Sequence, residues 1–379
     1  MTRPGRRLRL MFLCLIAFLA MVAGINWLAD PYGVWRIALV DRVYLGSQPG
    51  DRVLTPYRLR FERPTTLLVG SSRTLWGMPV EQGYRDGFLN ASLPGSSLDE
   101  LAAIVHIALR NPQLKRLVWG VDFFTFDENW AGYRDSETRL RLEGDLRLLV
   151  TDTLLSTDAL AASRKLLLRV VAGQTRLSPT QLAALPWPQE TIAEAFAHSH
   201  DDGLALATDA TVQGQLAAWV PTYKNFRLSA RHVALFHDTL MQAKAAGVDV
   251  ILFIGPMTAY ELECICHAGQ WDTFEQWKQQ LATIAPYWDF SGYNPLASAD
   301  EVFMDVVHFK PAPGHLILRH LLGQDTRHCG ASTRLVVDSG VWVDAATVDQ
   351  HLMQQAAARR AAERPDSRYH KLVTDMFRQ

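Results

Sequence analysis

The chain holds the three residue types of a covalent acyl-transfer site, in the order serine, aspartate, histidine. Ser72 follows an apolar run at residues 65–69 and the turn residue Gly70, while Asp305 and His308 lie three residues apart far downstream. A serine hydroxyl becomes a good nucleophile when a histidine takes its proton and a carboxylate orients that histidine. The sequence therefore predicts that Ser72 is a nucleophile, His308 its base and Asp305 the orienting acid.

Each of these residues also has a structural interpretation. Ser71 and Ser72 could cap the helix that follows them, because serine side chains accept hydrogen bonds from the first amides of a helix. Ser71 is also the alternative nucleophile. His308 could be a buried histidine whose hydrogen bonds are satisfied. Arg73 could be a surface charge, or it could bind an anion or pair with a carboxylate beside the nucleophile.

Elements of an alternating α/β pattern are expected to position these residues. Several strand candidates are continuous apolar runs, as is typical of parallel strands covered on both faces. The pattern predicts an α/β fold, a three-layer doubly wound parallel sheet, in which ligands bind beyond the carboxyl ends of the strands. The expected strands are residues 66–70, 87–91, 116–121, 248–254 and 287–290, and the main expected helices are residues 97–110, 230–246 and 313–322.

One interval interrupts this alternation. Residues 126–228 have helical character, notably at 137–172 and 190–218, and are too many for a simple crossover. We interpret them as a helical insertion in a domain that spans residues 65–325. The insertion could be a lid or partner-docking subdomain, or an embellishment away from the site. Residues 326–379 are expected to form a C-terminal tail with an amphipathic helix at 345–363.

The N-terminus predicts a membrane anchor. An apolar stretch at residues 10–28 follows four arginines and has about the 20 residues needed to cross a bilayer. Basic residues stay on the cytoplasmic side, so residues 1–30 form a single-pass anchor in the cytoplasmic (inner) membrane, and the rest is extracytoplasmic or periplasmic. Residues 31–64 are expected to be a connector. The alternative is a cleaved signal peptide with a small-residue site near Ala23 and Gly24.

Composition narrows the function further. The chain has 379 residues, and 48% of them are hydrophobic, which is enough to form a large buried core. Its formal net charge is -1, so a nucleic-acid partner is not expected. Cys14 falls in the anchor. A disulfide from Cys264 or Cys266 to Cys329 is expected in an oxidising compartment. The pair Cys264 and Cys266 lacks a second ligand pair at zinc-like spacing, so no metal is expected.

These residues resemble the SGNH (GDSL-like) hydrolase superfamily. They are closest to its membrane-anchored extracytoplasmic branch, which includes the D-alanyl transfer protein and polysaccharide O-acetylation proteins. Residues 70–72 are similar to the first block, with Ser72 as nucleophile. Residues 90–95, from Asn90 to Gly95, are similar to the second block, whose glycine amide supports the oxyanion together with that of the nucleophile. Residues 120–122 fall where the third block is expected, and residues 305–308 match the last. The resemblance implies a flavodoxin-like sheet and no cofactor.

The third block departs from the family pattern. Asp122 stands where the family has an asparagine, so a side-chain donor to the oxyanion is missing. Either Asp122 points elsewhere, or the amides of Ser72 and Gly95 stabilise the oxyanion alone, or the site is not a standard hydrolase. The order of the blocks is the ordinary one and favours the branch that resembles the teichoic-acid protein, or a generic member of the superfamily.

Three functions are compatible with these features. The first is an O-acyltransferase of the cell envelope, which takes an acyl group from a membrane-bound donor protein and passes it to a polysaccharide or similar polymer. The second is an esterase or deacetylase with the same triad and water as acceptor. The third is a non-catalytic scaffold of an envelope polysaccharide assembly, which Asp122 favours.

Overall fold

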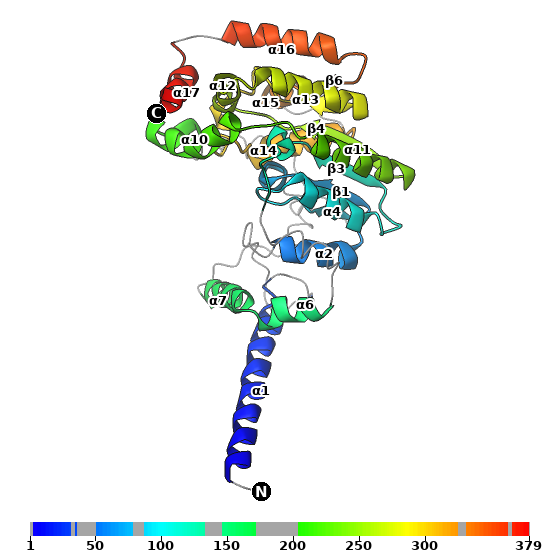
Figure 1. Cartoon of the computed structure of the whole chain (residues 1–379), viewed down its shortest axis with the longest axis vertical. Helices are drawn as coiled ribbons and strands as arrows, with labels where there is room; N and C mark the ends of the chain where they lie inside the picture. Colours follow the sequence, from blue (N-terminus) through cyan, green and yellow to red (C-terminus); the bar gives the residue numbers. More distant parts are fainter. Residues whose placement is uncertain are drawn as a thin grey trace. The chain divides into compact units, whose positions relative to one another are not determined.

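A computed structural model describes residues 3–31, 35, 51–78, 87–132, 146–171, 204–324, 331–362 and 366–378 (Figure 1). The chain forms two compact units. The anchor unit comprises residues 1–62, 81–84 and 138–185, and the sheet unit comprises residues 63–80, 85–137 and 186–379. Part of the interval interpreted as an insertion therefore belongs with the N-terminal helix, whereas the tail from residue 326 belongs with the sheet.

The sheet unit is built on a six-stranded, mostly parallel sheet in the order β2-β1-β3-β4-β5-β6. The first five strands run parallel, and the last pairs antiparallel with β5. All four residues of β1 are buried, which explains why this strand is an unbroken apolar run. The strands are β1 (Thr66–Val69), β2 (Phe88–Asn90), β3 (Arg116–Gly120), β4 (Asp249–Ile254), β5 (Tyr287–Asp289) and β6 (Val341–Val343).

Helices connect and cover the strands. Within the sheet unit, α4 packs against α11, α3 against α14, α12 against α17 and α10, and α13 against α16. Their bounds are α3 (Ser72–Gly77), α4 (Leu98–Ala108), α10 (Asp209–Lys224), α11 (Ala230–Ala245), α12 (Ala259–His267), α13 (Trp271–Ile284), α14 (Pro311–Leu321), α15 (Ala331–Asp338), α16 (Val348–Ala362) and α17 (Arg368–Arg378), and short helices lie at η2 (Phe123–Phe126), η4 (Leu204–Leu206) and η5 (Asp300–Val302).

The two strands that follow β1 in the sequence lie on opposite sides of it in the sheet: β2 on one side and β3 on the other. In open α/β sheets the carboxyl ends of the strands at such a switch point border a ligand-binding crevice. Ser72 follows β1, Gly95 follows β2 and Asp122 follows β3, so the sheet brings these three residues to one edge.

The C-terminal tail is tied to the sheet by a buried polar network. Lys278 on α13 is fully buried, and its ammonium lies 2.8 Å from the Asp289 carboxylate at the end of β5. His351 on α16 lies 2.8 Å from the same carboxylate oxygen, and Gln355 donates to it. Burial opposes the charge on Asp289, but Lys278 and His351 outweigh it and lower the pKa of this carboxyl. The contacts of His351 and Gln355 with Asp289 link α16 to the end of β5.

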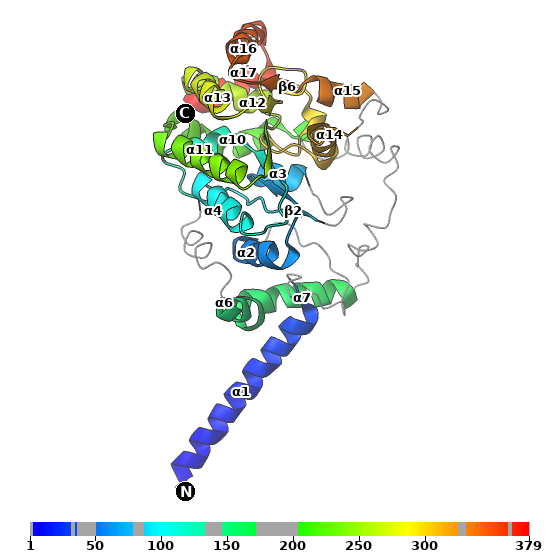
Figure 2. The same ribbon diagram turned by 90° about the vertical axis from the view of Figure 1, so that its right-hand side faces the viewer.

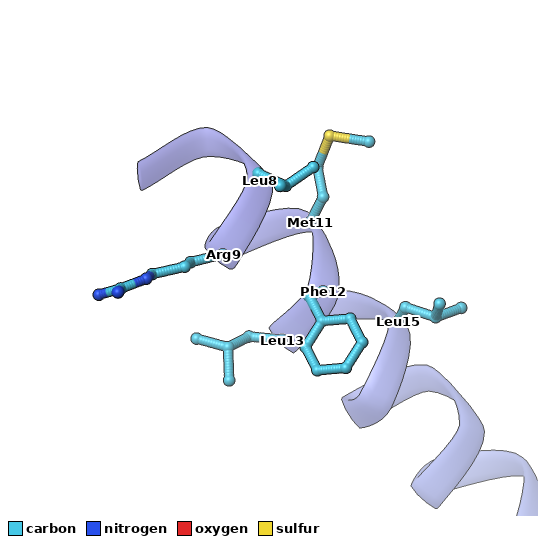
Figure 3. A pocket seen from close by; sticks show the side chains of 6 residues that line it. All are labelled: Leu8, Arg9, Met11, Phe12, Leu13 and Leu15. Atoms are coloured by element: carbon cyan, nitrogen blue, oxygen red, sulfur yellow. The ribbon is translucent and has the colours of Figure 1, made fainter. Parts of the chain in front are cut away.

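The anchor unit contains α1 (Arg3–Ala29), α2 (Asp51–Glu62), α6 (Leu146–Val150), the π-helical turn η3 (Thr151–Leu155) and α7 (Thr157–Val171). Residues 5–29 of α1 are long and apolar enough to cross a membrane. Figure 3 shows Leu8, Met11, Phe12 and Leu13 projecting outward from this helix, and their exposed fractions are 62–70%. Such exposed apolar side chains are expected on a helix surrounded by lipid.

The structure agrees with the expected mixed α/β class, and each expected strand is present within two residues of its expected bounds. The segment interpreted as a connector contains the helix α2, and Cys264 is a buried free thiol. Cys329, the expected disulfide partner of Cys264 or Cys266, lies outside the described residues. Strand β6, which the sequence analysis did not anticipate, closes one edge of the sheet.

Candidate active site

Ser72, His308 and Asp305 form a continuous chain of hydrogen bonds. Ser72 Oγ lies 2.8 Å from His308 Nε2, and His308 Nδ1 lies 2.7 Å from Asp305 Oδ2 and 2.9 Å from Oδ1. The carboxylate thus holds one ring nitrogen while the other faces the hydroxyl. In this arrangement the imidazole can take the serine proton and the carboxylate can stabilise the resulting charge.

The loop before α14 fixes the geometry of the acid and the base. Asp305 Oδ1 accepts hydrogen bonds of 2.9 Å from the backbone amides of Val307 and His308. Burial opposes ionisation of Asp305, but the hydrogen bonds and charge of His308 and these amides outweigh it and lower the pKa of the carboxyl. Thr258 donates to the carbonyl of Val306 at 2.6 Å and holds the loop against the start of α12. The acid is therefore ionised and preorganised.

The serine is positioned by the start of α3. Ser71 is fully buried and caps this helix, because its side chain accepts a hydrogen bond from the amide of Arg73 at 3.2 Å. Ser72 is the first residue of the helix, and its hydroxyl faces His308. Trp76, one turn further, packs its ring on that of His308 at a centroid distance of 4.4 Å. The two serines thus have different roles: Ser71 shapes the turn and Ser72 reaches the base.

Two backbone amides are available to an oxyanion. The amide of Ser72 is one of the first in α3, where helical amides have no partner in their own helix. Gly95, with φ +56°, adopts the left-handed conformation and lines the same cavity. Within the described part of the chain neither amide donates to another protein group. Both can therefore donate to a developing negative charge.

Asn90 supports this wall of the site rather than lining the cavity. Its side-chain amide donates to the carbonyls of Thr74 and Met78, and its oxygen accepts from the amide of Ser92. The residue therefore joins the end of β2 to α3. This link holds the loop that contains Gly95 beside the helix that begins at Ser72.

A cavity of about 210 Å³ opens beside the triad. Aromatic side chains form part of its wall, and the rings of Trp130 and Trp219 lie nearly parallel, 6.3 Å apart at 8°. Both tryptophans are only half-buried. The cavity is lined by Ser72, Gly95, Phe124, Trp130, Gln215, Trp219, Asp305, Val306, Val307 and His308.

Arg73 is not a surface charge but the centre of a buried cluster. Its guanidinium is bonded to Glu261 on α12 and lies 3.5 Å from Asp122, and Tyr223 on α10 donates to the same Glu261 oxygen. Burial disfavours the Arg73 charge, but Glu261 and Asp122 raise the pKa of the guanidinium above its usual value. For the Asp122 and Glu261 carboxyls burial is the largest effect, and it raises the pKa of each.

This cluster accounts for the orientation of Asp122. The side chain is 5% exposed, and its Oδ1 lies 3.5 Å from Arg73 Nε. Asp122 thus points toward the buried guanidinium. This agrees with the alternative that Asp122 points elsewhere, and the amides of Ser72 and Gly95 remain the candidate oxyanion donors.

A separate cluster could offer ligands to a metal. Glu263 and His267 on α12 and His370 on α17 each present a ligand atom, all within 4.8 Å of one another. Both rings are engaged through Nδ1, since that of His267 lies 2.9 Å from the Glu263 carbonyl and that of His370 lies 3.1 Å from Glu263 Oε2. These bonds are typical of a structural link between α12 and α17, and a metal would have to displace them.

Several residues of the site carry no motif in the sequence or lie in the interval interpreted as an insertion. Glu261 and Tyr223 had no motif, and Gln215, Trp130 and Trp219 come from segments that the analysis treated as part of an insertion. The position of Glu261 shortly after the carboxyl end of β4 was the one available signal, because residues there reach the same edge as Ser72.

Neither a comparison with protein-family models nor a search among curated proteins finds a match for this chain.

Proposed function

We propose that the chain is a membrane-anchored, extracytoplasmic serine O-acyltransferase that passes an acyl group to a hydroxyl of a cell-envelope polysaccharide or similar polymer. The observation that carries the proposal is the 2.8 Å contact between His308 Nε2 and Ser72 Oγ, with Asp305 holding the other ring nitrogen. A serine, a base and an orienting acid in this relation are the parts of a covalent acyl-transfer site.

The reaction would proceed in two halves. Ser72 Oγ attacks the acyl carbonyl carbon while His308 takes the hydroxyl proton, and the amides of Ser72 and Gly95 stabilise the oxyanion. The bond to the leaving group then breaks, and the leaving group receives the proton from His308. In the second half the acceptor hydroxyl gives its proton to His308 and attacks the acyl–Ser72 ester. The proton finally returns to the released serine.

The cavity wall supports a carbohydrate acceptor. Aromatic rings offer broad apolar faces, and the apolar face of a sugar ring can stack on them. Trp130 and Trp219 supply two such rings beside the triad, and the Gln215 side chain adds a polar group. This combination of apolar walls and a few polar groups is typical of small-molecule sites.

The resemblance to the SGNH hydrolase superfamily supports the same function. We propose that the parallel sheet and its helices form the three-layer arrangement of that superfamily. The basic N-terminus and the apolar helix α1 support an orientation in which the sheet unit is extracytoplasmic. There, a membrane-bound donor protein could supply the acyl group to Ser72.

An esterase is the second candidate. Its first half-reaction is the same, and water replaces the sugar hydroxyl in the second. The side chains of His308 and Asp305 are 13% and 29% exposed, which favours access of water to the acyl-serine. The scaffold hypothesis is less well supported, because a decayed site has no reason to retain the complete hydrogen-bond chain.

Acyl-enzyme trapping tests the proposal. The full-length protein in detergent is mixed with an activated acetyl ester, and its intact mass is measured. One acetyl group is expected on the wild type and none on Ser72→Ala. Ser229→Ala is the matched control, because Ser229 likewise lies at the start of a helix, as the buried N-cap of α11, but is not part of the triad. Absence of label on the wild type would favour the scaffold.

Acceptor dependence distinguishes transfer from hydrolysis. Acetate release is followed with and without candidate oligosaccharides, and the oligosaccharides are examined for new acetyl esters. If the protein is a transferase, adding the oligosaccharide should give acetylated sugar and reduce the release of free acetate. If it is an esterase, the release of acetate should be the same with and without the oligosaccharide. A reporter fused after Asp30 is expected to be active outside the cytoplasm; a cytoplasmic signal would contradict the proposed topology.

A further inference from the structure

We propose that the segment from α6 to α7 is a membrane-interface collar, which lies at the outer end of α1 and inserts one apolar flank into the phospholipid headgroup and acyl boundary. The proposal rests on the membrane anchoring described under the proposed function and on no part of the catalytic assignment. Its partner is a phospholipid surface. All its residues belong to the anchor unit.

The collar is held against the last turns of α1. Both helices contribute buried side chains that recur at three- and four-residue spacing, which is the pattern of one helix face packed on another. Figure 2 shows α7 lying across the end of α1. The buried residues are Val22, Asn26 and Ala29 on α1 and Ala159, Ala162, Ser163 and Leu166 on α7.

A polar contact inside this interface sets the depth of α7. Asn26 is fully buried; its side-chain oxygen accepts from Ser163 Oγ at 2.8 Å, and its amide donates to the Leu154 carbonyl at 2.8 Å. Polar groups at membrane depth need protein partners, because hydrocarbon supplies none. Asn26 lies within the apolar span Gly5–Ala29, so Leu154 and Ser163 must lie at the depth of its outer end.

Aromatic residues place that end at the membrane surface. The apolar stretch at residues 10–28 has about the 20 residues needed to cross the hydrocarbon, so its last turn lies at the outer boundary. Trp27 is 45% exposed there, and Trp35 donates its ring N–H to Thr153 at 3.1 Å. Tryptophan is enriched at this level of a bilayer.

The collar exposes more apolar surface than its length would suggest. Among the described residues beyond α1, ten large apolar side chains are exposed, and five of these lie between residues 146 and 171. Such a concentration marks an interaction surface. The five are Val150 (38%), Leu155 (38%), Leu167 (38%), Leu168 (57%) and Val171 (86%).

Opposite flanks of α7 differ in chemistry. Leu167 and Val171 are four residues apart and share one flank, which also holds the exposed basic residue Arg164. Asp158 is exposed and lies nine residues before Leu167, which is about 180° around a helix. The stripe that packs on α1 runs between them. This division is the one expected of an interfacial helix whose apolar flank meets lipid, with basic side chains near the phosphates.

Spin labels can locate these flanks. The full chain is reconstituted in nanodiscs of phosphatidylcholine and phosphatidylglycerol, with Cys264, Cys266 and Cys329 replaced by alanine. A nitroxide is attached at Leu167→Cys or Val171→Cys and, as the matched control, at Asp158→Cys, each with Cys14 also replaced. Its accessibility to oxygen, which concentrates in lipid, is compared with that to a water-soluble nickel chelate. All three positions are exposed, so the labels are compatible with folding.

We expect oxygen to relax the labels at 167 and 171 more than nickel does, and the reverse order at 158. Equal accessibility to the nickel chelate at all three positions would contradict the proposed collar. A label at 167 that neither oxygen nor nickel can reach would also contradict it, because that label would be covered by protein. A label on native Cys14, which is exposed on α1, reports on the anchor separately. If Cys14 is in lipid and 167 is in water, only the collar fails; if Cys14 is also in water, the anchoring itself fails.

Discussion

A Cβ atom on Gly314 would lie 1.7 Å from the carbonyl oxygen of Gly77, so α14 and α3 meet backbone to backbone. Helix α3 begins at Ser72, and α14 follows directly after the loop that contains His308. The close approach of the two helices therefore holds the serine within hydrogen-bond distance of its base. A side chain at Gly314 would separate them.

We accordingly expect Gly314→Ala to destabilise the fold and to weaken acylation of Ser72. The methyl group has to displace backbone, so a loss of about 2 kcal/mol or more is expected. Gly214→Ala is the matched control, because Gly214 also lies in a helix but a Cβ there would meet nothing within 4 Å. Chemical unfolding and acyl-enzyme yield measure both effects. Equal stability of the two variants would contradict the role of this contact.

Replacement of Asp305 by asparagine should leave the fold largely intact and impair the chemistry. Asparagine can still accept the backbone hydrogen bonds of Val307 and His308, but it no longer stabilises a charged imidazole. A fall of about 10³- to 10⁴-fold in the rate of serine acylation is expected for such a change. Stopped-flow acylation with an activated ester provides the rate. A fall of less than tenfold would indicate that Asp305 does not orient the base.

The buried Arg73 cluster should be sensitive to loss of Glu261. Glu261→Gln leaves the guanidinium with Asp122 as its remaining carboxylate, so we expect a loss of about 3 kcal/mol in the free energy of unfolding. The exposed pair of Arg116 and Asp249 supplies the control, since Asp249→Asn should cost less than about 1 kcal/mol. Similar losses in both variants would show that the cluster is not a buried ion pair.

Acid should destabilise the protein through His315. Burial lowers the pKa of this α14 ring from 6.5 to about 4. Between these values the unfolded chain binds the proton and the folded chain does not, so stability is complete above pH 6.5 and falls as the pH decreases to 4, by about 3 kcal/mol. His315→Phe should remove this part of the pH dependence. Unfolding of both proteins at pH 7 and 4 tests it, and parallel losses would exclude His315 as the cause.

Local patterns in the sequence determined the class of fold and the chemistry of the candidate site. The apolar run before Gly70 predicted a buried parallel strand, because a strand covered on both faces has apolar side chains on both of them. Ser72, Asp305 and His308 could be named from residue type and order alone. The apolar N-terminal helix was equally clear, since hydrophobic length is a local property.

Only the tertiary structure decided which distant residues meet. Glu261 lies 188 residues from Arg73, and no pattern near either residue encodes their pairing. The same is true of the contact between Gly314 and Gly77, and of Asn26 with Ser163 across the anchor unit. The periodicity of apolar residues indicates which face of a helix or strand is buried. Which residues contact that face depends on how all the helices and strands pack together.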